Sequence, residues 1–434
     1  MTHKRYPEYK DSGVEWIGNV PEHWTVAPMK AVADIVNGAT PDSGNPAYWD
    51  GDIAWFTPAD LDNENSTVLA EPRRKITANG LASCAARLTP AGSVVLSTRA
   101  PVGSVGVAST PSATNQGCRT LVPMCGFPAE LLAQMLVAAR AELGLRSNGT
   151  TFQELSTYSL ASLRIPVPSR DELSDISAAL DRETTHIDAL IAKKTRFIEL
   201  LKEKRQALIT HAVTNGLDPN VKMKDSGVEW IGNVPEHWQV IKFGRLARVV
   251  EGLVDPRIER YRSMPLFAPN HIESGTGRLL AVETAEKQNA ESGKYLCKSG
   301  TVVYSKIRPA LAKVIIAPED GLCSADMYPL DCSDRVDPHW LFYLMLSKPF
   351  TAWAITESDR VAMPKINRES LSELVAAVPP VTEQRAIVAG IESKLPRIDA
   401  ALGAVDRSIA LVKERRSALI NAAVTGQIDL REVA

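Results

Sequence analysis

The sequence predicts an α+β protein built as two copies of one plan, in which two mixed α/β domains are separated by two long antiparallel helices that form a coiled-coil-like pair. Three observations carry this prediction. A segment of fifteen residues occurs twice without a change, further matches follow at a second constant spacing, and a helical stripe of apolar residues extends over about forty positions. Together they indicate a pseudo-twofold internal repeat.

The first repeat is a short segment that we call the clip. Residues 10–24 read KDSGVEWIGNVPEHW, and residues 224–238 read the same fifteen letters, 214 positions later. Fifteen identities in a row exclude chance. The proline at position 21 favours a turn within the clip.

A more diverged repeat has a spacing of 211. The run at residues 202–205, KEKR, matches KERR at residues 413–416, and Ile187-Asp188-Ala189 matches Ile398-Asp399-Ala400. The chain is therefore expected to consist of a clip, a domain and a long helix, twice over. The expected segments are the N-terminal clip 1–24, domain 25–165, helix 166–216, linker and second clip 217–238, domain 239–375, and helix with C-terminal tail 376–434.

The first long helix is predicted over residues 171–213. Apolar residues recur there at steps of three, four or seven, with polar residues between them, which is typical of a coiled-coil-like stripe. The stripe consists of Leu173, Ile176, Leu180, Ile187, Leu190, Phe197, Leu201 and Leu208. Pro168 and Asp171 indicate its start, and Asn215-Gly216 is a stop signal. At 1.5 Å per residue the helix would be about 65 Å long.

The second long helix is predicted from about residue 382 to residue 424. Gly390 and Gly403 lower its helix propensity, and Pro396 is expected to kink or interrupt it. An amphipathic helix of this length needs a partner, and the matching first helix is the obvious one. The alternative is two unrelated helices in separate cores.

The regions between clips and helices contain short β-rich runs and many turn signals. Strands are expected at residues 93–96 and 301–304, each directly after a glycine. Short helices are expected at residues 128–143 and 337–354. Apart from such scattered similarities the two regions differ strongly in sequence.

The composition is that of a globular protein, with 44% hydrophobic residues, 23% charged residues and a formal net charge of −2. The sequence contains no run of about 18 apolar residues and no signal-peptide core, so we expect a cytoplasmic protein without membrane contact. Its six cysteines form no Cys-x-x-Cys pair that would indicate a metal site. A chain of this charge can bind nucleic acid only if its Lys and Arg gather on one face, or if partner subunits share the contact.

Several motifs resemble the specificity subunits of type I restriction–modification enzymes, and the resemblance covers essentially the whole chain. The clip is one of them. Gly38-Ala39-Thr40-Pro41, followed by YWDGDIAWFTPADL at residues 48–61, looks like the opening of a target-recognition domain. The run VPPVTEQR at residues 378–385 resembles the family's entry into a long helix. The first copy, VPSRDEL at residues 167–173, lacks the Glu-Gln pair, which weakens any role for Gln384.

The resemblance implies that the two domains are target-recognition domains, each of which reads one half of a split site in double-stranded DNA. It also implies that the helices hold the two readers at a fixed distance, that two methyltransferase (M) subunits dock on this scaffold, and that motor–nuclease (R) subunits join for restriction. The chain itself would be non-catalytic and would bind no cofactor, while S-adenosylmethionine, ATP and Mg²⁺ would be bound by the partner subunits.

Symmetry follows from the same plan. Because the two domains differ in sequence, the DNA site is expected to be asymmetric. Bringing the ends of the chain together would complete a cyclic pseudo-twofold arrangement with two similar docking sites for two identical partners.

Base readout needs Arg, Lys, Asn, Gln, Ser or Thr on loops that reach the groove edges. Arg99 follows an expected strand of the first domain, and Lys306 follows the matching strand of the second. The candidate DNA-binding residues are Arg99, Asn115, Gln116, Arg119, Arg146, Asn148, Lys306, Arg308, Arg360 and Lys365. Taken singly, each residue is more readily explained as a surface charge or a turn residue, whereas the set as a whole exceeds what chance would give.

The apolar side chains of the clip are expected to pack against the helices rather than to contact DNA. They are Val14, Trp16, Ile17, Val20 and Trp24. His23 and His237 have no neighbouring Asp or Cys pattern that would indicate a metal, so a structural role is expected for both.

Two other functions compete with DNA readout. Asn45-Pro46-Ala47-Tyr48 resembles the Asn-Pro-Pro-Tyr motif with which adenine methyltransferases hold a flipped base. Alanine replaces the second proline, and no glycine-rich cofactor loop precedes the motif, which argues against a stand-alone adenine methyltransferase. The other alternative is a coiled-coil scaffold whose domains bind proteins, and salt-dependent affinity for one particular duplex would reject it.

Overall fold

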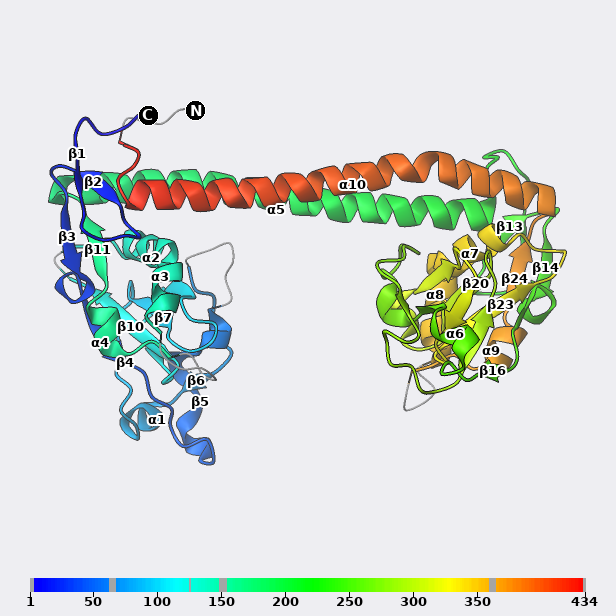
Figure 1. The fold of residues 1–434 in the computed structure, drawn as a ribbon, viewed down its shortest axis with the longest axis horizontal. Helices are drawn as coiled ribbons and strands as arrows, with labels where there is room; N and C mark the ends of the chain where they lie inside the picture. The colour runs from blue at the N-terminus through cyan, green and yellow to red at the C-terminus, as the bar shows by residue number, and fades with distance from the viewer. Residues whose placement is uncertain (1–3, 62–67, 125, 148–153, 359–363, 432–434) are drawn as a thin grey trace. The chain divides into compact units, whose positions relative to one another are not determined.

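The computed structural model describes residues 4–61, 68–124, 126–147, 154–358 and 364–431 (Figure 1). Contacts divide the chain into two compact units, and the division falls inside both long helices. Unit 1 comprises Met1–Arg196 with Asp406–Ala434, and unit 2 comprises Phe197–Val405. Each unit contains one mixed α/β domain and a stretch of both helices.

Unit 1 begins with the first clip, an antiparallel hairpin of β1 (Tyr9–Asp11) and β2 (Asn19–Pro21). The chain enters the domain through β3 (Thr25–Pro28) and leaves it through β11 (Arg164–Val167), which pairs antiparallel with β3. The elements between them are η1 (Met29–Ala31), β4 (Ala33–Asn37), η2 (Pro46–Tyr48), β5 (Trp49–Phe56), η3 (Pro58–Asp60), β6 (Lys75–Ile76), α1 (Ala78–Ala82), β7 (Val94–Ser97), β8 (Val105–Val107), β9 (Ser112–Thr114), β10 (Cys118–Pro123), α2 (Ala129–Ala138), α3 (Arg140–Leu145) and α4 (Thr157–Ala161). They form an antiparallel sheet β4-β10-β7-β8 and a three-stranded sheet β6-β5-β9.

Unit 2 repeats this frame. The second clip is a hairpin of β12 (Met223–Asp225) and β13 (Asn233–Pro235), and the domain lies between the paired strands β14 (Gln239–Lys242) and β24 (Val375–Val378). The elements between them are η4 (Phe243–Arg245), β15 (Ala247–Val249), β16 (Leu253–Val254), α6 (Glu259–Arg262), β17 (Pro265–Phe267), η5 (Pro269–His271), β18 (Glu283–Thr284), β19 (Lys294–Cys297), β20 (Val302–Ser305), η6 (Pro309–Leu311), β21 (Val314–Ile316), β22 (Gly321–Cys323), β23 (Met327–Cys332), α7 (Pro338–Leu346), α8 (Lys348–Ser358) and α9 (Arg368–Glu373). One sheet, β15-β23-β20-β21, matches the four-stranded sheet of unit 1, whereas the other has five strands in the order β16-β19-β22-β17-β18.

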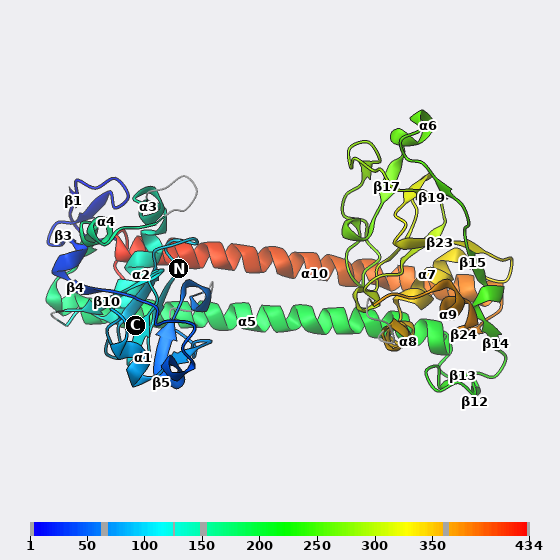
Figure 2. The same ribbon diagram turned by 90° about the horizontal axis from the view of Figure 1, so that it is seen from below.

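The two long helices are α5 (Arg170–Asn215) and α10 (Val381–Val424). In each unit a stretch of α5 lies beside a stretch of α10 (Figures 1 and 2). The stop signal after the first helix is confirmed, because α5 ends at Asn215 and Gly216 adopts a φ of 77°. A left-handed backbone of this kind is the usual end of a helix and favours glycine.

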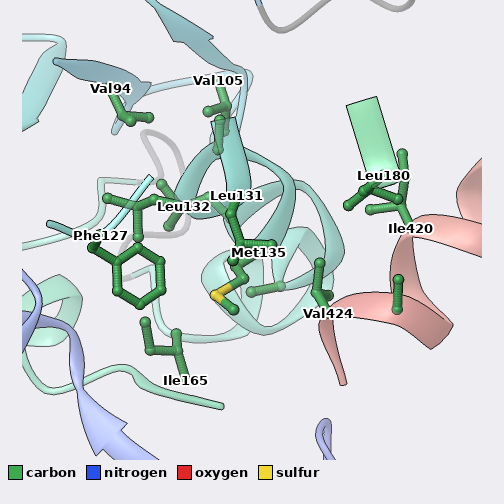
Figure 3. Packing of buried hydrophobic residues seen from close by; sticks show 14 of the residues in the cluster. Val94, Val105, Phe127, Leu131, Leu132, Met135, Ile165, Leu180, Ile420 and Val424 are labelled. Atoms are coloured by element: carbon green, nitrogen blue, oxygen red, sulfur yellow. The ribbon is translucent and has the colours of Figure 1, made fainter. Parts of the chain in front are cut away.

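A single hydrophobic core joins the first domain to its stretch of helices. Helix α2 packs against β7 and β8. Figure 3 shows Leu131 and Met135 of α2 between the sheet and the helix residues Ile420 and Val424. Ile17, Val20 and Trp24 of the first clip are buried in the same cluster, and Val14 and Trp16 pack against it half-buried. The expected packing role of the clip is therefore confirmed.

Both strands expected from the sequence are present, shifted by one residue, as β7 and β20. The two expected short helices are each broken in two. The first divides into α2 and α3 at Ala139, and the second divides into α7 and α8 at Ser347, whose backbone is extended. Pro349 lies in the first turn of α8, where a missing backbone N–H costs nothing.

The apolar stripe of α5 differs from the expected one at two positions. Leu190 is 38% exposed and Phe197 is 48% exposed, while Ile191 and Ile198 are buried in their place. The expectation took a step of three residues from Ile187 to Leu190, whereas the buried face takes a step of four to Ile191 and keeps that offset at Ile198. The buried face therefore passes to the next residue along the chain after Ile187.

Pro396 lies inside α10 and does not interrupt it. Ile391 and Leu395 before it and Ile398 after it are buried. An interior proline costs about 3 kcal/mol, and burial of large aliphatic side chains stabilises by about 1.5–3 kcal/mol each. Packing on both sides of the proline is therefore large enough to keep the helix continuous.

Two equivalent ion pairs join the helices and explain part of the repeat. In unit 1, Arg416 Nε of α10 lies 2.8 Å from Asp188 Oδ1 of α5. In unit 2, Arg205 Nε of α5 lies 3.0 Å from Asp399 Oδ1 of α10. Arg205 and Arg416 are 211 positions apart, as are Asp188 and Asp399. Each helix thus supplies an Arg to one pair and an Asp to the other, which is the pattern of two similar helices packed antiparallel.

We expect Asp188→Asn to lower the free energy of unfolding by about 1 kcal/mol, because it weakens a charge-assisted bond that is only partly exposed. Asp399→Asn should cost less, since the side chain of Asp399 is 50% exposed and that of Asp188 is 28% exposed. Urea unfolding followed by circular dichroism measures both. A larger cost for Asp399→Asn would contradict this ranking.

The described ends of the chain meet within unit 1. Asp429 N donates to Lys4 O at 2.8 Å, and the Gln427 side chain donates to Asn19 O of the first clip at 2.6 Å. The segment that follows α10 therefore adjoins the first clip. In unit 2 the second clip follows α5 directly along the chain.

Candidate nucleic-acid interface

The candidate residues of the first domain gather where β7 ends. Arg99 lies two residues beyond β7 and forms an isolated backbone bridge with Glu154, and Leu155 N donates to Thr98 O at 2.9 Å. The Arg99 Nη2 atom lies 3.2 Å from Glu154 Oε2. Both side chains are about half exposed, so this ion pair lies at the surface.

Arg119, the second residue of β10, lies near the same carboxylate and is less exposed than Arg99. Its Nη2 atom lies 3.9 Å from Glu154 Oε1, and its Nε donates to Thr157 Oγ1 at 3.1 Å. Its Nη1 donates to the carbonyl oxygens of Gln116 and Cys118 at 3.0 Å. Burial lowers the pKa of Arg119, and the negative charge of Glu154 opposes that shift. The guanidinium is held in one orientation, as planar recognition of an anion requires.

Gln116 belongs to this group, whereas Asn115 serves the turn. The exposed Gln116 side chain accepts a hydrogen bond from Thr40. Asn115 Oδ1 accepts from Gly117 N at 3.0 Å, which stabilises the loop between β9 and β10. We name Arg99, Gln116, Arg119, Glu154 and Thr157 the first cluster.

Two candidates of the first domain do not join the first cluster. Arg146 follows α3, where its Nε lies 2.6 Å from Glu142 Oε1. This is an ordinary pair one helical turn apart. Asn148 lies outside the described residues.

The second domain has basic side chains at the corresponding place. Lys306 directly follows β20, and its Nζ lies 5.4 Å from the centre of the Tyr328 ring. Lys365 lies opposite Ile307 in an isolated backbone bridge. Arg308 is exposed and adopts a φ of 48°, with its N–H donating to Pro364 O at 3.3 Å. Arg360 lies outside the described residues.

Sequence reasoning missed Arg368, the first residue of α9. Its Nη2 donates to Tyr295 Oη at 2.7 Å, and its guanidinium carbon lies 5.8 Å from the Tyr295 ring and 5.9 Å from the Tyr328 ring. Two aromatic side chains therefore hold an exposed Arg in place. We name Lys306, Tyr328, Lys365 and Arg368 the second cluster. The sequence did indicate the start of α9, because Asn367 is a favourable N-cap residue and Arg368 directly follows it.

The two clusters occupy equivalent positions in the two domains. The bridge between Arg99 and Glu154 corresponds to the bridge between Ile307 and Lys365, two residues beyond β7 and β20 respectively. Arg119 and Tyr328 are the second residues of the matching strands β10 and β23. Thr157 and Arg368 each begin a short helix that follows an N-cap Ser or Asn. One place on the fold thus carries different chemistry in each domain.

The clip histidines bind carboxylates of the helices. His23 Nε2 lies 2.9 Å from Glu172 Oε2, which also accepts from the Trp24 indole N–H at 3.1 Å. In the second copy, Glu383 accepts from His237 at 2.7 Å and from Trp238 at 3.1 Å. The expected structural role of the histidines is confirmed. Among the described residues no group of three or more His, Cys, Asp or Glu could hold a metal ion.

The two glutamates correct one sequence comparison. Glu172 and Glu383 are 211 positions apart, so the first copy lacks only the Gln of the Glu-Gln pair. Gln384 has a role of its own. It is fully buried, donates to the carbonyl oxygens of Arg335 and Pro379 at 2.9 Å, and accepts from Asp337 N at 2.7 Å. It thereby fixes the start of α7 on α10.

The Asn45-Pro46-Ala47-Tyr48 motif has a local structural use. Asn45 is the N-cap of η2, and its Oδ1 accepts from Ala47 N at 3.1 Å. The side chain that a methyltransferase would need for a flipped base is therefore engaged in a turn. Across the described helices, none combines the length and apolar character needed to cross a membrane.

Comparison with known proteins shows which family the chain resembles. The family model described as type I restriction modification DNA specificity domain matches residues 21–200 and 235–398. The specificity subunit of the type I restriction enzyme EcoDI from Escherichia coli is 30% identical over 295 residues, which cover 64% of this chain and 66% of that protein. The MjaIX specificity subunit of Methanocaldococcus jannaschii is 26% identical over 98% of both chains.

Similarity in fold extends over most of the chain. A solved structure, from work on complex assembly and conformational transition of the type I R-M system, aligns with a TM-score of 0.66 at 16% identity. The alignment covers 93% of this chain and 98% of that one.

Proposed function

The chain belongs to the family of type I restriction–modification DNA specificity proteins, and on that premise we propose that its two domains read the two halves of a split, asymmetric DNA site. The observation that carries this proposal is the pair of equivalent clusters. Both present exposed cations beside a strand end, which suits contact with phosphates and base edges. Their side chains differ at every position compared, so the half-sites should differ.

The helices support the second part of the proposal, a fixed spacing of the two readers. Two readers on one duplex must be separated by about one helical turn, roughly 34 Å, or a multiple of it. α5 and α10 are continuous over 46 and 44 residues, and a helix of that length measures about 65–70 Å. A flexible linker would leave the spacing undefined.

The clips support the third part, docking of two methyltransferase (M) subunits on similar surfaces. Each clip is bound to its helix by the same Trp and His contacts to a glutamate. Two similar surfaces suit two identical partners. Motor–nuclease (R) subunits would complete the complex, and S-adenosylmethionine, ATP and Mg²⁺ would be bound by these partners.

The test is sequencing of methylated adenines in DNA from cells that carry this chain with its methyltransferase subunit. Control cells carry the methyltransferase subunit alone. We expect a split, asymmetric methylated motif that disappears without the chain. Methylation that is the same in both strains would reject DNA readout and favour a scaffold that binds only proteins.

A further inference from the structure

Glu154 contacts two cations with its two carboxylate oxygens. Oε2 lies 3.2 Å from Arg99 and Oε1 lies 3.9 Å from Arg119. A carboxylate that faces two guanidinium groups resembles a phosphate in both charge and geometry, because Arg binds either anion with the same fork of N–H donors. Glu154 therefore occupies two guanidinium groups of the kind that bind phosphates.

The contact is built to be exchangeable. The side chain of Glu154 is 41% exposed and that of Arg99 is 48% exposed, so water screens their attraction. Arg119 is only 13% exposed, and its bonds to Thr157, Gln116 and Cys118 hold it in place without Glu154. Removal of the Glu154 charge would thus leave the binding surface assembled.

The second domain carries the opposite charge at the same place. Lys365 forms the backbone bridge that corresponds to that of Glu154. One structural position is therefore anionic in the first domain and cationic in the second. The fold therefore does not require an ion pair at this position, because the corresponding bridge of the second domain joins Lys365 to Ile307.

We propose that Glu154 is an internal substitute for a DNA phosphate, which occupies Arg99 and Arg119 until DNA displaces it and thereby weakens the binding of DNA through the first domain. The inference rests on the proposed DNA-reading function. Non-specific affinity arises from Lys and Arg that neutralise phosphates, so an internal anion on two arginines lowers it. The second domain, with Lys365 in place of the glutamate, makes the larger contribution to the first encounter with DNA.

The experiment measures binding of a random-sequence duplex to the full chain in complex with its methyltransferase subunits, by fluorescence anisotropy at a series of salt concentrations. We expect Glu154→Gln to raise affinity about fivefold to tenfold at low salt, and to steepen the slope of log K against log salt by about 1, the value for one more neutralised phosphate. Lys365→Gln should lower affinity and flatten the slope by about the same amount.

Glu71→Gln is the control, because it removes a carboxylate from a Glu–Lys pair of the same domain that contains no candidate DNA-binding residue. It should leave the slope unchanged, and an effect equal to that of Glu154→Gln would overturn the inference. Weaker binding by Glu154→Gln would also overturn it, since Glu154 would then support DNA contact. In either case a methylated motif that still depends on the chain would leave the proposed function standing, whereas the absence of such a motif would reject that function itself.

Discussion

Arg368→Ala is expected to weaken binding of the cognate duplex about tenfold to a hundredfold, which corresponds to roughly 1–3 kcal/mol for one Arg that reads a base edge. Tyr295 and Tyr328 hold its guanidinium, and its position corresponds to that of Thr157 in the first cluster. The loss should be confined to the second half of the site. Sequencing of methylated DNA should therefore show a motif with a relaxed second half and an unchanged first half.

Two further variants distinguish base recognition by Arg368 from the non-specific attraction of a positive charge to DNA. Arg368→Lys keeps the charge but removes the planar fork, so it should retain non-specific affinity and lose discrimination. Arg257→Ala removes an exposed Arg that pairs with Asp255 outside the second cluster, and should leave the motif unchanged. If Arg368→Ala behaves like Arg257→Ala, then Arg368 does not contact DNA.

Glu172→Ala should lower the free energy of unfolding by about 3 kcal/mol, because it leaves the buried indole N–H of Trp24 and three partly exposed donors without their acceptor. Its side chain is 5% exposed and accepts from His23, Trp24 and Ser169. Arg431 Nη1 lies 2.7 Å from the same carboxylate. The measurement is urea unfolding of the full chain near pH 7.

The second copy offers a matched comparison. Glu383 is 29% exposed, and Pro380 occupies the position that corresponds to Ser169, so one hydroxyl donor is missing. Glu383→Ala should therefore cost less, about 1–2 kcal/mol. Equal losses for the two variants would mean that Ser169 and Arg431 contribute nothing to the stability of the first copy.

The Glu172 site also predicts a dependence on pH. Burial acts to raise the pKa of Glu172, but the hydrogen bonds from His23 and Ser169 and the charge of Arg431 outweigh it, and the pKa lies below its ordinary value. Stabilisation by the ionised carboxylate is thus complete above the ordinary glutamate value of about 4.3, and it is lost as the pH falls through the lower value of the folded protein. Glu172→Ala should lose this part of the acid sensitivity.

The plan of the molecule could be predicted from the amino-acid sequence alone. The identical clips and the matches at a spacing of 211 residues predicted two similar halves. This prediction succeeded because the same contacts occur in both halves, and the same contacts need the same residues. Arg205 and Arg416 recur because each pairs with the Asp of the other helix. Trp24 and Trp238 recur because each donates to a glutamate in the first turn of a long helix.

The composition of the two clusters and the buried face of α5 depend on contacts between residues that are far apart along the chain. Arg99, Arg119, Lys306 and Lys365 were candidates from the sequence, but Glu154 and Arg368 were not, because their partners lie between 35 and 73 positions away along the chain. Local pattern carries no information on which distant side chain will face an arginine. The choice of Ile191 and Ile198 over Leu190 and Phe197 has a related cause, since all four are apolar and only packing against other parts of the fold determines which face of a helix is buried.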